Sequence, residues 1–357
     1  MIEKMNTKDL KIDLQSNGIR VLAGNKGRKG GAGPAGSNMF IFGNTVTSAP
    51  TFAKFVSKSP YSIELEGERG ILRRGDKEIT KVRVPRPRFY DLKTKDGIPH
   101  KKIALLHGED CLATTVVQRC IYWNTPERCK FCGIELSKEV TLEVKKPEEL
   151  AEVAEAAKRL DGVTHTTLTT GTIRERDKGI EMLSKCASAI KDSAGISVHV
   201  QFEPPKDLAC IEDLYENGVD TVGIHIESFD KEVLGYIAPA KAKIGIERYV
   251  EAWKRSVDIF GENQVSSFII VGLGESDESI IDGSKILSNL GVYPFVLPLS
   301  PIPGTYLEDE VPPSFKRMKN IYEAVSNTIK DANLSWKKSK AGCVRCRACS
   351  ALDVFEE

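Results

Sequence analysis

The chain has 357 residues, of which 41% are hydrophobic and 28% charged, with a formal net charge of +1 at pH 7. This size allows one large domain with appendages or two domains, and the charge balance gives no electrostatic reason to expect a nucleic-acid or anionic-membrane partner. Because no uninterrupted apolar stretch approaches about 18 residues and the N-terminus lacks the apolar core of a signal peptide, we expect a cytoplasmic protein without a membrane segment.

The first hundred residues differ in composition and residue pattern from the rest of the chain. Residues 24–37, GNKGRKGGAGPAGS, are Gly-rich and basic, which is typical of a loop, either a flexible linker or a cover over a bound phosphate or cofactor. In residues 61–84, apolar and polar residues alternate around EGERG and RRGD turns, which predicts short antiparallel strands. A Pro-broken connection follows at 85–91. We therefore expect an accessory β-rich region at residues 1–103.

From residue 104 onwards, strand-like and helix-like segments alternate. Residues 147–162 indicate a helix most clearly, because the segment starts with Pro147, ends at Gly162 and places its apolar residues on one face. We expect further helices at 178–192, 207–218, 246–261, 278–291 and 312–334, and strands at 103–107, 164–172, 195–205, 219–228, 265–276 and 292–305. This alternation predicts parallel βα units, hence a complete or partial α/β barrel or an open doubly wound sheet. The open nucleotide-binding sheet is disfavoured, since no GxGxxG or GxxxxGK[ST] motif follows the first strand.

Polar residues gather where these expected strands end. In α/β barrels the chemistry lies at the carboxyl ends of the strands, so these positions are the first candidates for a site. They are Thr169, Thr170, Gly171, Thr172, Glu203, His225, Glu227, Glu275 and the segment from Ser300 to Thr305.

Nine cysteines need an explanation in an intracellular chain, where a disulfide framework is not expected. Six of them form two clusters: Cys120, Cys129 and Cys132 in RCIYWNTPERCKFC, and Cys343, Cys346 and Cys349 in CVRCRAC. The other three are Cys111, Cys186 and Cys210. Cys186 and Cys210 are expected to be buried small hydrophobes in helices, whereas Cys111 follows the first expected strand and is a candidate ligand. We interpret the two triplets as metal sites.

Three thiolates on one loop can hold three irons of a [4Fe–4S] cluster and leave the fourth iron for a non-protein ligand. A closed zinc site normally has four ligands and would need Cys111 or a histidine to complete it. The first loop resembles the cluster-binding loop of radical S-adenosylmethionine (SAM) enzymes, whose last two cysteines have the CxxC spacing with an aromatic residue between them, as in Cys129-Lys130-Phe131-Cys132. The usual pattern is CxxxCxxC, whereas eight residues separate Cys120 from Cys129.

Four downstream segments carry the same resemblance in the expected order: TLTTGT (167–172), GIHIESFD (223–230), FIIVGLGES (268–276) and PLSPIPGTYLED (298–309). The resemblance to the superfamily spans roughly 105–310. The whole chain, including the GGAGP loop and the cysteine tail, resembles a biotin-synthase-like group related to two-component lipoyl synthases. This resemblance implies a TIM-type barrel of the radical SAM kind at 104–311 and a helical, Cys-containing tail at 312–357. It also implies SAM-binding positions at Thr169, Thr170, Gly171, Thr172, Glu203, Glu227, Gly272 and Gly274.

The second triplet predicts an auxiliary Fe–S cluster, with [4Fe–4S] the expected type, and a fourth ligand that is Cys111, another side chain or a small molecule. The resemblance implies sulfur insertion at an unactivated carbon with this cluster as donor. Two alternatives remain open: a rearrangement or C–C bond-forming enzyme whose tail cluster transfers electrons, and a zinc-binding structural protein.

The expected partners follow from the same resemblance. They are SAM, a low-potential electron donor such as ferredoxin or flavodoxin, and either a second radical SAM protein or a carrier-protein substrate. His107 and His225 are candidates for contact with SAM or substrate. No residue is assigned an acid–base role, because hydrogen-atom abstraction by a cofactor radical needs no general base.

Overall fold

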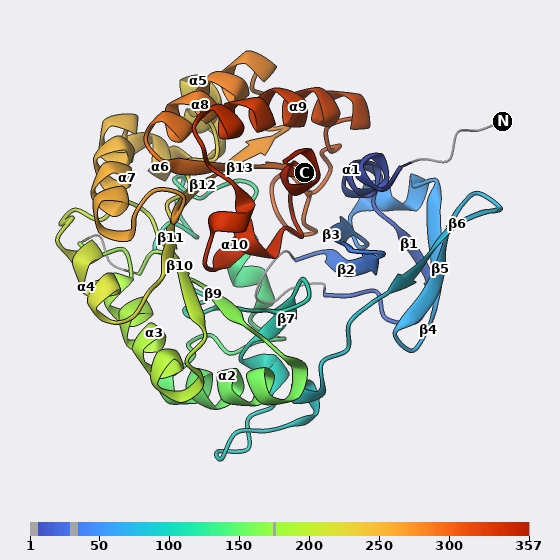
Figure 1. Cartoon of the computed structure of the whole chain (residues 1–357), viewed down its shortest axis with the longest axis horizontal. Coiled ribbons are helices and arrows are strands. Elements are labelled where there is room, and N and C mark those ends of the chain that lie inside the picture. Colours follow the sequence, from blue (N-terminus) through green and yellow to red (C-terminus); the bar gives the residue numbers. More distant parts are fainter. Residues whose placement is uncertain (1–5, 29–34, 174–175, 357) are drawn as a thin grey trace.

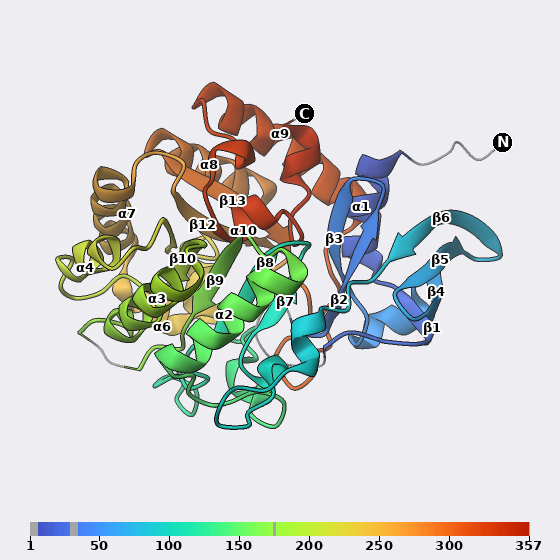
Figure 2. The same cartoon turned by 60° about the horizontal axis from the view of Figure 1, so that its bottom comes forward.

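The computed structural model describes residues 6–28, 35–173 and 176–356. Two sheets organise these residues: a six-stranded sheet near the N-terminus and a curved seven-stranded sheet that is covered by helices (Figures 1 and 2). Within these described residues, no helix has the length and apolar character needed to span a bilayer.

The N-terminal sheet has the strand order β1-β4-β5-β6-β2-β3. Its strands are β1 (Arg20–Ala23), β2 (Ser37–Phe42), β3 (Thr45–Pro50), β4 (Tyr61–Glu66), β5 (Arg69–Arg74) and β6 (Lys77–Arg83). All pairings are antiparallel except that of β1 with β4, which confirms the hairpins expected at 61–84. Helix α1 (Thr7–Asn17) packs on β3. Part of the expected Gly-rich loop, 29–34, lies outside the described residues.

The second sheet has the order β13-β12-β11-β10-β9-β8-β7. Its strands are β7 (Leu105–His107), β8 (Cys111–Thr115), β9 (His165–Thr169), β10 (Ser197–Gln201), β11 (Thr221–Gly223), β12 (Val265–Val271) and β13 (Val292–Pro298). Strands β8 to β13 are parallel, so the sheet is a partial TIM-type barrel as expected.

The expectation that 103–107 is the first barrel strand was wrong. Strand β7 pairs antiparallel with β8, with His107 opposite Cys111, and the first parallel strand is β8. A tight turn at Gly108, with φ of 65°, joins the two strands. Cys111 is therefore the first residue of a barrel strand and not part of a loop that follows one.

Helices link the barrel strands on the outer face. They are α2 (Pro147–Asp161), α3 (Ile180–Ala194), α4 (Cys210–Glu216), α5 (Lys231–Ile237), α6 (Pro239–Ile244), α7 (Ile246–Phe260) and α8 (Asp277–Asn289). Helix α2 ends as expected, with Gly162 in the left-handed conformation at φ of 69°. Helices α5 and α6 were not expected from the sequence. Cys186 is fully buried in α3, as expected, but Cys210 at the start of α4 is only half-buried.

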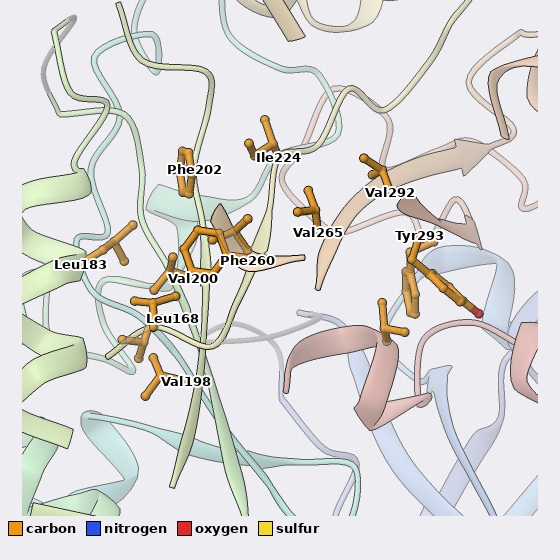
Figure 3. Packing of buried hydrophobic residues seen from close by; sticks show 14 of the residues in the cluster. Leu168, Leu183, Val198, Val200, Phe202, Ile224, Phe260, Val265, Val292 and Tyr293 are labelled. Carbon is orange, nitrogen blue, oxygen red and sulfur yellow. The ribbon is translucent and has the colours of Figure 1, made fainter. Parts of the chain in front are cut away.

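The barrel core is continuous between the sheet and its helices. Figure 3 shows Leu168, Val198 and Val200 on the inner strands beside Leu183 of α3 and Phe260 of α7. These strand residues are fully buried because the parallel sheet is covered by helices.

The C-terminal segment returns across the barrel. Helix α9 (Phe315–Asp331) contacts α8 and α1, and the short helix α10 (Gly342–Cys346) contacts β9, β10 and β13. Figure 1 shows α10 over the middle of the barrel with β2 and β3 beside it. The 3-10 helices are η1 (Lys54–Lys58), η2 (Arg88–Asp91), η3 (His100–Lys102), η4 (Ile134–Ser137), η5 (Trp336–Lys338) and η6 (Leu352–Phe355).

The N-terminal region holds this segment in place. The Ser48 backbone N–H donates to the Ala348 carbonyl at 2.7 Å, and the Gln15 side chain donates to the same carbonyl at 3.2 Å. Lys11 Nζ donates to Asp353 Oδ1 at 2.6 Å and to the Arg347 carbonyl at 2.9 Å, and the Lys11 side chain is fully buried. The cysteine tail is thus held by N-terminal residues that lie more than 300 positions away from it in sequence.

Replacing Lys11 by methionine should destabilise the protein by about 3–5 kcal/mol, because it leaves the Asp353 carboxylate buried without its partner. Urea unfolding under reducing conditions, followed by circular dichroism, measures the change. The matched control is Lys54→Met, which breaks an exposed ion pair to Asp309 and should leave the unfolding midpoint unchanged. Equal effects of the two substitutions would contradict a structural role for the buried pair.

Candidate functional site

A cavity of about 380 Å³ lies inside the partial barrel. Its wall includes Cys132 of the first triplet together with Cys343 and Cys349 of the second triplet. Thr169, Gln201 and other strand residues line the middle. The two cysteine triplets therefore border one cavity, although more than 200 residues separate them in sequence.

The first triplet lies on the loop that follows the carboxyl end of β8. The Cys120 backbone N–H donates to Glu135 Oε1 at 3.0 Å, and the Cys132 N–H donates to the Cys129 carbonyl at 3.2 Å. Lys130 N–H donates to the Ile237 carbonyl, which anchors the loop to the end of α5. Backbone contacts thus fix the loop on both sides of the CxxC segment.

Burial raises the pKa of Cys132 to about 11 and raises the pKa of Cys129 well above its usual value. The neighbouring Cys132 raises the pKa of Cys129 further, and Cys120 does the same for Cys132. Burial also raises the pKa of Cys120. Neutral thiols are therefore favoured without a metal, and a bound metal would be needed to hold all three as thiolates.

The two aromatic residues between Cys120 and Cys129, Tyr122 and Trp123, are paired with cations. The Arg128 guanidinium lies 3.3 Å from the centre of the Trp123 ring, and Lys178 Nζ donates to the Tyr122 hydroxyl at 2.8 Å. These contacts give the long gap between Cys120 and Cys129 a structural role, because they hold its aromatic side chains in place.

The TLTTGT segment at the end of β9 is joined to the loop of the first triplet. The Ile121 N–H donates to the Thr172 carbonyl at 2.8 Å, and a Cβ at Gly171 would stand 1.8 Å from the Arg119 carbonyl oxygen. Only glycine allows so close an approach of the two backbones. Thr172 Oγ1 donates to Glu203 Oε2 at 2.8 Å, so the Thr172 hydroxyl already has a hydrogen-bond partner in the residue that lies just after β10.

Glu227 is the charged residue of the cavity wall among the described residues. It has a left-handed backbone with φ of 73°, and its Oε1 lies 3.0 Å from Lys241 Nζ. Its Oε2 is buried without a hydrogen-bond partner. This conformation, which costs a non-glycine residue free energy, directs attention to Glu227 as a binding group.

His225 stands beside Glu227 in the same wall. Its ring stacks on Phe268 at 3.7 Å, its Nδ1 accepts from the Phe268 N–H at 3.1 Å, and its Nε2 is buried without a partner. Burial and the Lys241 ammonium lower the pKa of His225 well below its usual value. The neutral ring has one polar atom left for a bound molecule.

The predicted glycines after β12 have a structural role. Gly272 and Gly274 have φ of 106° and 116°, and the backbone N–H groups of Gly272 and Leu273 donate to the Glu275 carboxylate at 2.8 and 2.7 Å. Arg317 in turn contacts Glu275 at 3.0 Å. Gly272 and Gly274 are not among the described residues that line the cavity.

The second triplet lies beside the β7–β8 hairpin at the amino end of β8, and Gln201 at the carboxyl end of β10 also contacts it. Cys346 Sγ is 3.1 Å from His107 Nδ1, Cys349 Sγ is 3.6 Å from His107 Nε2, and Gln201 Nε2 donates to Cys343 Sγ at 3.4 Å. The hydrogen bond from Cys111, followed by the effect of His107, lowers the pKa of Cys346 well below its usual value despite burial. The structure thus brings Cys111 to the second triplet and not to the first.

Two glycines make room for this arrangement. A Cβ at Gly108 would stand 2.7 Å from Cys346 Sγ, and a Cβ at Gly342 would stand 2.4 Å from the His199 ring. Both glycines have positive φ, 65° and 84°. The β7–β8 turn and the start of α10 therefore approach their neighbours more closely than other residues allow.

In the part of the chain that the structure describes, no three His, Cys, Asp or Glu side chains already stand in the geometry of a metal site. The donor chemistry of the first loop nevertheless fits an Fe–S cluster with an open iron, since it offers three thiols and no fourth one. Five buried polar atoms of cavity-lining residues lack a hydrogen-bond partner among the described residues: Gln15 Oε1, Gln118 Nε2, His225 Nε2, Glu227 Oε2 and Ser300 Oγ. The residues therefore fit a cluster together with a polar small molecule.

Sequence reasoning missed several residues of the site. Gln201, Phe268 and Gln118 line the cavity, and Lys241 neutralises Glu227 from a helix that was not expected. Gln201 could have been found from the sequence, because it lies two residues before the expected strand-end residue Glu203. Nothing in the sequence places Lys241 near the barrel.

Comparison with known proteins gives three findings. Residues 125–283 match the family model described as the Radical SAM superfamily, a segment that contains Cys129 and Cys132 but begins after Cys120. The bacteriochlorophyllide c C-7(1)-hydroxylase of Chlorobaculum limnaeum is 25% identical over 259 residues, which cover 66% of this chain. The chain spans 63% of the length of that relative.

Solved structures show a similar fold. HydG, a maturase of the [FeFe]-hydrogenase, superposes with a TM-score of 0.51 at 16% identity, and the match covers 69% of this chain and 57% of HydG. Methylornithine synthase, PylB, has a TM-score of 0.48 at 17% identity and covers 69% of this chain and 72% of its own. The HydG likeness supports the partial barrel described above.

Proposed function

We propose that this chain, whose residues 125–283 match the Radical SAM superfamily model, is a radical SAM enzyme that inserts sulfur at an unactivated carbon of an apolar substrate. The observation that carries this proposal is the single cavity bordered by both cysteine triplets. A group bound by the first triplet and a group bound by the second triplet would both reach a substrate held in the cavity between them.

The first cofactor site is proposed at Cys120, Cys129 and Cys132, which would hold three irons of a [4Fe–4S] cluster. With SAM on the fourth iron, this cofactor would supply a 5′-deoxyadenosyl radical that removes a hydrogen atom from the substrate. Thr169 and Glu227 line the cavity and are proposed to bind SAM, with Thr170, Gly171, Thr172 and Glu203 supporting the same strand ends. Gly272 and Gly274 are proposed to shape the neighbouring turn.

The protein's own contribution is to orient the substrate and exclude water. Apolar side chains such as Phe131, Phe268 and Leu297 line most of the cavity, and no Lys or Arg is among the described residues of its wall. A substrate with a phosphate or free carboxylate in this space would lack a cationic partner. The part of the substrate that enters the cavity is therefore proposed to be uncharged.

A second Fe–S cluster is proposed at Cys343, Cys346 and Cys349, and its sulfide is the proposed source of the inserted sulfur. The alternative is an enzyme for rearrangement or C–C bond formation whose second cluster transfers electrons. The contact of His107 with two tail thiols favours this alternative, because hydrogen bonds to cluster sulfurs are a common way to set a reduction potential. A zinc-binding structural protein is the third candidate for the function of the whole chain.

The hydroxylase relative supports a reaction at carbon. That relative is named as a C-7(1)-hydroxylase, and hydroxylation and sulfur insertion both replace a C–H bond by a bond to a heteroatom. We propose the same class of replacement for this chain, with sulfur as the incoming atom.

The proposed division of the chain is an accessory region at 1–103, a radical SAM core at 104–311 and a cluster-bearing tail at 312–357. The accessory region holds the tail, since Lys11, Gln15 and Ser48 contact residues 347–353. Proposed partners are a low-potential ferredoxin or flavodoxin and, for sulfur insertion, a second radical SAM protein or a carrier-protein substrate.

Isotope labelling tests the proposal. Full-length protein reconstituted anaerobically with iron and ³⁴S-sulfide should release 5′-deoxyadenosine from SAM under reductant, and a carrier-bound acyl substrate should gain ³⁴S in a single turnover. Two outcomes would contradict the cluster as sulfur donor: product that carries unlabelled sulfur from added sulfide, and turnover in which the cluster keeps all its sulfide. The second outcome would favour the electron-transfer alternative. Mass spectrometry of the product gives the readout.

A further inference from the structure

The β7–β8 hairpin forms the floor on which the tail thiols rest. His107 and Cys111 are paired across this hairpin, and both contact Cys346. Cys111 is 1% exposed, His107 4% and Cys346 4%, so this contact is closed to solvent. Neither residue belongs to the CxxCxxC segment.

The position of the tail relative to the hairpin is firmly determined. The Cys346 sulfur lies against Gly108, where no side chain would fit, and Lys11, Gln15 and Ser48 hold residues 347 and 348 from the opposite side. The approach of Cys111 to the triplet therefore comes from the packing of three chain regions and not from a mobile terminus.

The triplet supplies three thiolates, and a closed cluster needs one more ligand. The side chains that form hydrogen bonds with the triplet, among the described residues, are His107, Cys111 and the neutral amide of Gln201. Cys111 is the one thiol in this set, and a thiolate is the usual fourth ligand of an Fe–S cluster. We propose that Cys111 closes the tail site as its fourth thiolate and that His107 donates a hydrogen bond to a cluster sulfur through its one N–H. This inference rests on the second cluster of the proposed function.

His107 is assigned as a donor because of how its ring lies. Its Nδ1 is 3.1 Å from one thiol sulfur and its Nε2 is 3.6 Å from another, so both nitrogens face sulfur atoms. A ligating imidazole points one nitrogen at the metal and turns the other to an outer partner. A ring placed alongside two thiolates instead acts on their charge, and N–H donors to cluster sulfurs raise the reduction potential.

A closed four-thiolate site has a functional consequence. No iron would remain open for a substrate atom, so the second cluster would give electrons or sulfide and would not hold the substrate through iron. Four thiolate ligands therefore exclude the coordination of substrate by the auxiliary cluster.

The test uses the full chain with Cys120, Cys129 and Cys132 changed to alanine, so that only the tail site can hold iron. After anaerobic reconstitution this background should contain about four irons per chain. Adding Cys111→Ala should lower the iron to three or fewer and produce the EPR signal of a [3Fe–4S] cluster on oxidation. The matched control is Cys186→Ala, a fully buried cysteine in α3, which should change neither iron content nor spectrum.

Three outcomes would overturn the inference: zinc in place of iron, an unchanged cluster in the Cys111→Ala variant, or loss of an iron in His107→Leu. If Cys111→Ala fails to fold by circular dichroism, Cys111→Ser replaces it and should retain the cluster with an altered EPR spectrum. His107→Leu should keep its iron but show a lower midpoint potential, and His107→Gln, which retains an N–H donor, should restore part of the shift. Release of 5′-deoxyadenosine by wild-type protein is measured separately, so failure of the proposed function remains distinguishable from failure of this inference.

Discussion

Replacing Cys129 by alanine should abolish the release of 5′-deoxyadenosine from SAM and lower the iron content of reconstituted protein from about eight to about four atoms per chain. Cys129 is part of the triplet whose loop is anchored to α5 through the neighbouring residue Lys130. Two remaining thiols cannot hold a cube on three irons, so the open iron that SAM needs would be lost. Chromatography of the SAM reaction and iron analysis provide the two measurements.

The control for this substitution is Cys186→Ala, which removes a buried thiol of the barrel's outer layer. It should retain both SAM cleavage and all eight irons, about four at each site. SAM cleavage at the wild-type rate by the Cys129→Ala protein would contradict the assignment of the first triplet. A colourless wild-type protein that binds zinc would contradict it as well.

Replacing Cys346 by alanine should separate the two halves of the proposed reaction. The first triplet follows the carboxyl end of β8, whereas the second lies beside the amino end of β8, so 5′-deoxyadenosine should still form. The sulfur-containing product should fall below detection, because Cys346 is the tail thiol that contacts both His107 and Cys111. A single-turnover assay that quantifies 5′-deoxyadenosine and product from the same sample measures both effects.

The outcome distinguishes the two radical SAM alternatives only in combination with labelling. If the Cys346→Ala protein still forms product, the tail site has no part in the chemistry. If product is lost and the wild-type cluster retains its labelled sulfide, the tail conducts electrons. The control is Cys210→Ala, which changes a half-buried cysteine at the start of α4 and should leave both yields unchanged.

Several elements were correctly predicted because their signals are local. Helix α2 starts at Pro147 and ends before Gly162, and the hairpin of β4 and β5 turns at the expected EGERG segment. Alternating strands and helices identified the partial barrel because a parallel strand needs a crossover helix before the next one. The first strand was misplaced because the short apolar run before Gly108 has the same composition as a barrel strand, and only pairing distinguishes its direction.

The sequence by itself determined the kind of chemistry, since two cysteine triplets with CxxC spacing and polar strand ends are properties of short segments. Only the tertiary structure decided where these groups meet: it placed both triplets at the wall of one cavity and brought Cys111 to the tail. It also gave the N-terminal region a role, through contacts such as Lys11 with Asp353 across 342 positions. Spacing along the chain reports which residues share a loop, but packing between distant segments determines which of them share a site.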